Sequence, residues 1–134
     1  MPNYWFVTGS SRGLGRATVM AALDAGHTVM ATARNPGDLD DLATQYRGRI
    51  VPYALDVSDA AAVGRAVVAA KDTFGRVDVV VNNAGYASLA SVEDMSQDAF
   101  AEQMATNFFG TVHVSKAAVP ILREQGAGHI FQIA

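Results

Sequence analysis

Short apolar runs alternate along the chain with longer segments in which apolar residues recur every three or four positions. The short runs predict strands, at Tyr4 to Thr8, Thr28 to Thr32, Ile50 to Leu55, Val77 to Val81 and His129 to Ile133. They lack the polar and apolar alternation that is typical of a strand with one face in water. Strands that alternate with helices in this way predict βαβ units and a parallel sheet that helices cover on both faces.

Three of the longer segments have helical periodicity. Asp38 and Ser58 precede two of them and are expected to cap their N-termini. The apolar positions are Leu39, Leu42, Ala43 and Tyr46 in the first, and Val63, Ala66, Val67, Ala70 and Phe74 in the second. A third stripe predicts one long helix from about Gln97 to Arg123, with Pro120 expected to kink or shorten it. This stripe consists of Phe100, Met104, Phe108 and Val112, and we expect it to belong to the core.

Pro52 places the third strand in the sheet. A proline has no N–H to donate to a ladder, so a strand that contains one is expected at an edge. In a doubly wound parallel sheet of order 3-2-1-4-5, the third strand is such an edge. The expected fold is therefore an α/β fold of this order, and the 134 residues are expected to form one domain.

The composition excludes several classes of function. The formal net charge is -3, and the ten Lys and Arg residues are spread along the chain, which indicates neither a nucleic acid nor an anionic membrane as partner. No apolar run has the length of a membrane span. The absence of cysteine excludes disulfides and thiolate sites, and makes a cytoplasmic location the default expectation. His27, His113 and His129 have no spacing typical of a metal site.

The first predicted strand runs into a glycine-rich turn, Gly9-Ser10-Ser11-Arg12-Gly13-Leu14-Gly15, that opens a helical segment. Such a turn lets backbone amides approach a pyrophosphate at the N-terminus of the helix. Its spacing, G-x-x-x-G-x-G, is not followed by Gly-Lys-Ser/Thr, so a nucleoside triphosphatase is disfavoured. The alternative is a strand-to-helix loop that binds no ligand.

Polar residues follow the other strands where they end. Arg34 follows the second strand, where an NAD-binding protein would carry an acid for the ribose hydroxyls. Because that acid is missing, we expect Arg34 and Arg12 to bind a 2′-phosphate, although solvated surface arginines are the alternative. Asp56 and Val57 follow the third strand. Asn82, Asn83, Ala84 and Gly85 follow the fourth strand, which borders the first at the switch point where ligands bind.

As a set, the glycine turn, Asp56, the segment Asn82 to Gly85, and Asn107 resemble the short-chain dehydrogenase/reductase family, over essentially the whole chain. The resemblance implies a Rossmann-type fold in which Asp56 accepts a hydrogen bond from adenine. It also implies that Asn107 helps position a water in the proton relay of the catalytic tetrad. The competing interpretations are a helix cap for Asp56, a structural turn after the fourth strand, and an Asn107 amide satisfied by backbone. The expected cofactor contacts are Gly9, Ser11, Arg12, Gly13, Leu14, Gly15, Arg34, Asp56, Val57, Asn83, Ala84 and Gly85.

The resemblance further implies an oxidoreductase that transfers hydride between a carbonyl or secondary alcohol and NADP(H), with NAD the less favoured cofactor. A dimer or tetramer is implied, with the long helix as interface. The family's catalytic serine, and its tyrosine four positions before a lysine, come after the fifth strand and are not found here. We therefore expect the chain to be the cofactor-binding part of a longer enzyme, truncated after the fifth strand. The alternatives are a non-catalytic nucleotide-binding module or degenerate fragment, and a binder of adenine nucleotides or methyl donors.

Overall fold

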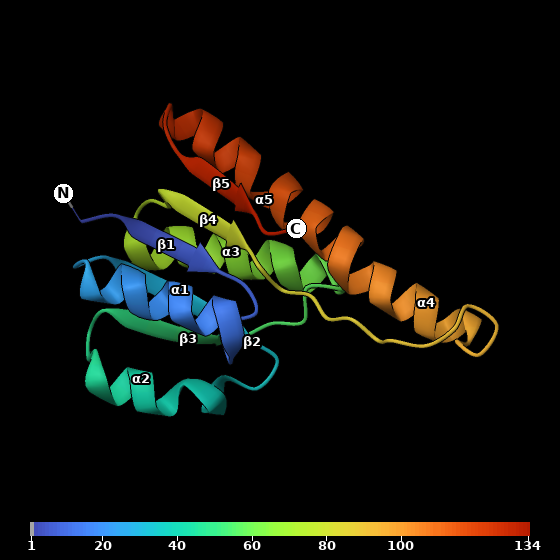
Figure 1. The fold of residues 1–134 in the computed structure, drawn as a ribbon. Helices are drawn as coiled ribbons and strands as arrows, with labels where there is room; N and C mark the ends of the chain where they lie inside the picture. Colours follow the sequence, from blue (N-terminus) through green and yellow to red (C-terminus); the bar gives the residue numbers. More distant parts are fainter. Residues whose placement is uncertain (1) are drawn as a thin grey trace.

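The computed structural model describes residues 2–134 as a five-stranded parallel sheet with helices on both faces (Figure 1). The order is β3-β2-β1-β4-β5, as predicted, and Pro52 lies in the edge strand β3. None of the helices in these residues has the length and apolar character needed to cross a membrane. The strands are β1 (Tyr4–Val7), β2 (Thr28–Ala33), β3 (Ile50–Ala54), β4 (Val79–Asn82) and β5 (His129–Gln132).

The two faces of the sheet carry separate apolar clusters, because neighbouring residues of a strand point to opposite sides. On β1, Val7 joins the cluster beneath helices α1 (Gly13–Asp24) and α2 (Asp40–Gln45). Its neighbour Phe6 joins the cluster beneath α3 (Ala60–Phe74) and α5 (Gly110–Gln125). Both side chains are almost fully buried, at 0% and 1% exposure. The absence of polar alternation in the sequence therefore did indicate a sheet covered on both faces.

Side-chain hydrogen bonds move several element boundaries from their predicted places. Strand β4 begins at Val79 rather than Val77, and the Val77 backbone instead pairs with the Gln125 side chain, at 3.0 and 2.7 Å. The predicted cap Asp38 is wrong, because the Asn35 side chain accepts from the Gly37 amide and a 3₁₀ turn, η1 (Pro36–Leu39), precedes α2.

The predicted cap Ser58 is also wrong. Asp59 accepts the Ala62 amide at the start of α3, at 3.0 Å. The Ser58 hydroxyl is 2.7 Å from Asp56 Oδ1 and donates to it, so it is turned away from the helix.

The predicted long helix exists and runs through three segments: α4 (Gln97–Met104), a π-helical segment η2 (Ala105–Phe109) and α5. Pro120 lies inside α5 and does not end the helix, which continues to Gln125. In Figure 1, α4 extends beyond the carboxyl ends of the strands, whereas α5 packs along the sheet. The sheet therefore covers only the second half of this helix.

The prediction that the apolar stripe of this helix is core was wrong. Phe100, Met104 and Phe108 are 39%, 51% and 52% exposed, and Val112 is half-buried. The buried positions of α5 are Gly110, Val114 and Ala118. Periodicity identifies an apolar face, but it does not tell which surface covers that face.

Candidate functional site

A cleft of about 1200 Å³ lies at the carboxyl ends of the central strands. Every predicted cofactor contact except Gly15 lines it, and Asn107 does not. The glycine turn after β1 lies between Arg34, which follows β2, and Asn83, which follows β4. The remaining lining residues are Ala33, Asn35, Asp38, Leu55, Ser58, Tyr86, Ala87, Glu102, Ala105 and Thr106.

Thr8 joins the two sides of the cleft at the end of β1. Its Oγ1 accepts hydrogen bonds from the backbone amides of Asn83 and Ala84, both at 3.0 Å, and lies 3.4 Å from the Val81 carbonyl, to which it donates. Asn83 Nδ2 donates to the Gly9 carbonyl at 3.1 Å. Thr8 is 1% exposed, so the segment after β4 is fixed to the glycine turn from inside the protein.

Two glycines of the turn have distinct physical roles. Gly13, the first residue of α1, has φ +61°, a conformation that side chains disfavour, but a Cβ there would meet no atom within 4 Å. At Gly15 a Cβ would lie 2.0 Å from the Gly9 carbonyl oxygen and 2.3 Å from Asn83 Nδ2. Gly13 thus lets the chain turn into the helix, and Gly15 lets the helix approach the turn closely.

The N-terminus of α1 is open to an anion. The N-cap residue, Arg12, makes no side-chain hydrogen bond to the helix, and the first turn contains no acidic residue. Ser10, which could otherwise compete for these amides, donates instead to the Val7 carbonyl at 2.9 Å. Unpaired backbone N–H groups and the helix dipole favour negative charge at such a position.

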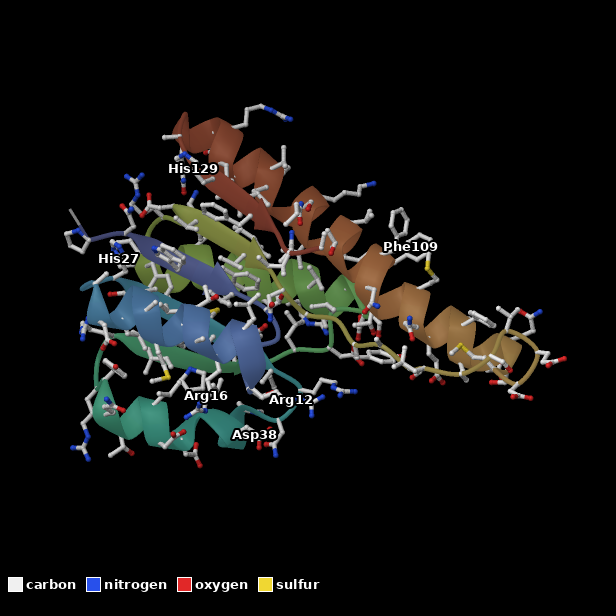
Figure 2. The ribbon with its side chains drawn as sticks, in the orientation of Figure 1. Arg12, Arg16, His27, Asp38, Phe109 and His129 are labelled. Atoms are coloured by element: carbon white, nitrogen blue, oxygen red, sulfur yellow. The ribbon has the colours of Figure 1, made fainter. Side chains whose placement is uncertain are left out.

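The two arginines expected to bind a phosphate are exposed and line the same cleft. The ion pairs found within residues 2–134 involve Arg16 and Arg76, so neither Arg12 nor Arg34 is neutralised there. Figure 2 shows Arg12 and Arg16 near the end of α1 that faces Asp38. Arg16 donates to the Asp38 carbonyl at 3.2 Å and pairs with Asp41, which links α1 to the η1 turn.

Asp56 keeps its negative charge in the cleft. The Ser58 hydroxyl and the Ser58 amide donate to Asp56 Oδ1, at 2.7 and 3.0 Å, and with the nearby charge of Arg34 they lower the pKa of Asp56 below its ordinary value of 3.8. A carboxylate is therefore presented at neutral pH, and it can accept a hydrogen bond from a ligand.

Asn107 lies in the π-helical segment and is exposed. Its Oδ1 accepts from the Tyr86 amide at 2.9 Å, and its Nδ2 donates to the Tyr86 carbonyl at 2.7 Å. These reciprocal bonds hold the chain directly after Gly85. Asn107 is therefore joined to the cleft through the loop and does not line it.

Sequence reasoning did not assign a role to Thr8, Tyr86 or His113, which the structure places at or behind the cleft walls. A threonine at the end of a buried strand, just before a glycine turn, was a usable signal for Thr8. The partners of Tyr86 and His113 are 21 and 56 positions away in the sequence, and no local pattern reveals them.

Comparison with known proteins gives consistent matches over this fold. The family model described as short chain dehydrogenase matches residues 3–134. "Oxidoreductase BOA17" of Botryotinia fuckeliana is 52% identical over 135 residues, which cover 100% of this chain and 49% of that protein. A short-chain dehydrogenase structure from Streptomyces avermitilis has a TM-score of 0.96 at 36% identity, covering 100% of this chain and 49% of that one.

A structure of ElxO with NADP bound has a TM-score of 0.92 at 28% identity, covering 100% of this chain and 56% of that one. The chain spans about half the length of the curated relatives that it matches, with 49%, 45% and 43% of three of them covered. The glycine turn, the strand order and the family match over residues 3–134 agree, and the chain belongs to the short-chain dehydrogenase family.

Proposed function

We propose that residues 1–134 are the NADP(H)-binding domain of an oxidoreductase that transfers hydride between this cofactor and a carbonyl or secondary alcohol. One observation carries the proposal: a single cleft contains the open N-terminus of α1 with Arg12, the unpaired Arg34 after β2, and the segment after β4 on its other side. This arrangement suits a long anionic ligand with a second phosphate at one end. The NADP bound in the ElxO structure supports the same assignment.

The residues of the cleft fit the parts of NADP(H). The backbone amides at the start of α1 would hold the pyrophosphate, with Gly9, Ser11, Gly13 and Leu14 around it, and Gly15 lets the helix lie close enough. The guanidinium groups of Arg12 and Arg34 would bind the 2′-phosphate. The cofactor supplies or accepts the hydride when it is bound.

We assign the adenine base and the nicotinamide side of the cofactor to the two remaining walls of the cleft. Asp56, a carboxylate beside Val57, would accept a hydrogen bond from the adenine amino group. Asn83, Ala84 and Gly85 would line the ribose and nicotinamide side, where Thr8 accepts from the backbone amides of Asn83 and Ala84.

Asn107 is proposed as the one member of the catalytic tetrad in this chain. Both polar atoms of its side chain are hydrogen-bonded to Tyr86, and its backbone carbonyl accepts from the Thr111 hydroxyl at 3.5 Å. A water would therefore be positioned through the second lone pair of this carbonyl. The side chain would then serve to hold the loop that borders the nicotinamide side.

Binding titrations with NADPH, NADH and S-adenosylmethionine test the proposal. We expect NADPH to bind at least tenfold more tightly than NADH, and Arg34→Gln to weaken NADPH roughly tenfold without affecting NADH, because charge-assisted hydrogen bonds to the 2′-phosphate are lost. Arg47→Gln, at an exposed residue outside the cleft, is the matched control. Equal affinity for NADPH and NADH would refute the role of the arginines, and a preference for S-adenosylmethionine would favour a methyl-donor binder.

Turnover distinguishes an oxidoreductase from a non-catalytic nucleotide-binding module. The longer enzyme of which this chain is proposed to be the cofactor-binding part is incubated with NADPH and a panel of ketones and aldehydes, and loss of absorbance by the reduced nicotinamide is followed. We expect carbonyl-dependent oxidation of NADPH. Tight NADPH binding with no oxidation by any carbonyl would favour the binding module.

The exposed aromatic face of the long helix supports a homo-oligomer, a dimer or a tetramer, as part of the proposal. Phe108 and Phe109 are about half exposed, and their rings are in edge contact at 5.0 Å between centroids. Figure 2 shows Phe109 standing out from the helix. Burial of such an apolar face against a second copy would remove it from water.

A further inference from the structure

The corner between β3 and α3 forms the adenine side of the cleft and is held largely by its own hydrogen bonds. The Asp59 amide donates to the Asp56 carbonyl at 3.1 Å, and the Leu55 amide donates to Ala33 of β2 at 3.0 Å. The Ser58 amide and hydroxyl hold the Asp56 carboxylate. These bonds fix the corner, but none of them involves the Val57 carbonyl. That carbonyl points to α5.

The first turns of α5 pack directly against this corner. A Cβ on Gly110 would lie 2.5 Å from Val57 Cγ2, so the helix approaches Val57 as closely as a glycine allows. Three residues further on, His113 Nδ1 lies 3.0 Å from the Val57 carbonyl oxygen, and the pair is partly buried. Because a carbonyl can only accept, Nδ1 carries the proton and donates, in the neutral ring or in the charged one.

The Val57 carbonyl and the Ser58 amide belong to one planar peptide group. His113 holds the carbonyl end of this plane, and Asp56 Oδ1 holds the amide end, at 3.0 Å. Rotation of the plane would therefore break both bonds. The orientation of the Asp56 carboxylate thus depends on a histidine that lies behind the wall of the cleft.

We propose that His113 is a positioning residue for the adenine end of the bound dinucleotide. By donating to the Val57 carbonyl, it fixes the peptide plane whose amide orients Asp56 toward the base. This inference rests on the proposed function, because it takes the ligand to be an adenine dinucleotide. His113 does not line the cleft and makes no contact with the ligand in this scheme.

Two substitutions at His113 distinguish the effect of its hydrogen bond on ligand affinity from the effect of its packing. His113→Leu keeps a side chain of similar size without a donor. His113→Asn places an amide nitrogen as many bonds from Cα as Nδ1 is, and so restores the donor. Dissociation constants are measured by displacement titration for NADPH, for adenosine 2′,5′-bisphosphate, which carries only the adenine half, and for reduced nicotinamide mononucleotide, which lacks it.

We expect His113→Leu to weaken NADPH and the bisphosphate roughly fivefold, the effect of one lost hydrogen bond, and to leave the mononucleotide within about twofold. His113→Asn should bind all three ligands within about twofold of the unsubstituted protein. The inference is overturned if His113→Leu leaves NADPH affinity unchanged, if it weakens the mononucleotide equally, or if His113→Asn fails to restore binding. Absence of NADPH binding by the unsubstituted protein would instead overturn the proposed function.

Discussion

Replacement of Gly15 by alanine tests the close approach of α1 to the glycine turn. The added Cβ would lie 2.0 Å from the Gly9 carbonyl oxygen and 2.3 Å from Asn83 Nδ2, whereas ordinary contacts begin at 3.4 Å. The helix and the turn would have to separate by more than an ångström. The methyl group would also intrude on the hydrogen bond from Asn83 Nδ2 to Gly9, which is 3.1 Å long.

The expected loss of stability combines three contributions. Forcing a methyl group into a packed site costs about 1–3 kcal/mol, and disturbing the hydrogen bond costs about 1 kcal/mol more. Alanine in a helix gains up to about 1 kcal/mol over glycine, which offsets part of this cost. We expect Gly15→Ala to lower the free energy of unfolding by about 1–3 kcal/mol. We expect it to weaken NADPH binding at least tenfold, because the displaced amides would hold the pyrophosphate.

Urea unfolding followed by the fluorescence of Trp5, together with NADPH titration, measures both effects. The control is Gly64→Ala in α3, where a Cβ meets no atom within 4 Å. It should stabilise the protein by about 0.5–1 kcal/mol and leave NADPH affinity unchanged. If Gly15→Ala unfolds at the same urea concentration as the unsubstituted protein and binds NADPH equally well, the close approach of α1 to the turn does not require a glycine at position 15.

Three further outcomes follow from the site. Thr8→Val should lower the free energy of unfolding by about 2–4 kcal/mol in urea titrations, because the Asn83 and Ala84 amides lose their shared acceptor. Thr8→Ser, which keeps the hydroxyl, should lose about 1 kcal/mol, and equal losses would contradict the role of Oγ1. NADPH affinity should fall as the pH is lowered through about 6, where a 2′-phosphate gains a proton, while NADH affinity stays level. Asp56 should not contribute in that range, because its lowered pKa keeps the carboxylate charged until more acidic pH. A parallel fall in NADH affinity would refute the assignment of this pH dependence to the 2′-phosphate. Phe108→Ser should shift a dimer or tetramer toward smaller species in sedimentation experiments, because it removes an exposed apolar ring, and an unchanged distribution would count against this interface.

The sheet was predictable because several local signals agree on one topology. The strands lack polar alternation, and each of the first four is followed by a helical segment, which indicates a parallel sheet. Pro52 then selects the edge position for its strand, and the structure places it there. Most of the cleft follows from this topology alone, because residues just after parallel strands gather at one edge of the sheet.

The contacts that shape the cleft were not predictable in the same way. The Asn83 side chain reaches the Gly9 carbonyl across 74 positions, and His113 reaches Val57 across 56. The first bond depends on how the segments after β1 and β4 lie beside each other, and the second on how α5 packs against the corner between β3 and α3. The spacing of residues along one segment specifies neither. The predicted N-caps Asp38 and Ser58 were wrong because each has a neighbour in the sequence that is an equally good acceptor. The observed N-caps are Asn35 and Asp59.

The apolar stripe was misread because the first half of the long helix lies beyond the sheet and because a π-helical segment changes the phase of the helix. An i to i+5 hydrogen-bond pattern inserts roughly one extra residue, which rotates the positions after it by about 100° relative to those before it. The stripe of Phe100, Met104 and Phe108 lies before or within the segment and is exposed, whereas α5 turns Val114 and Ala118 inward. No residue of α4 or of the π-helical segment is buried, so the stripe is exposed because no surface covers this half of the helix. The change of phase also separates it from the buried face of α5. Asn107 lies in the π-helical segment, and its side chain is hydrogen-bonded to the Tyr86 backbone. The segment that interrupts the helical period therefore also links the helix to the cleft.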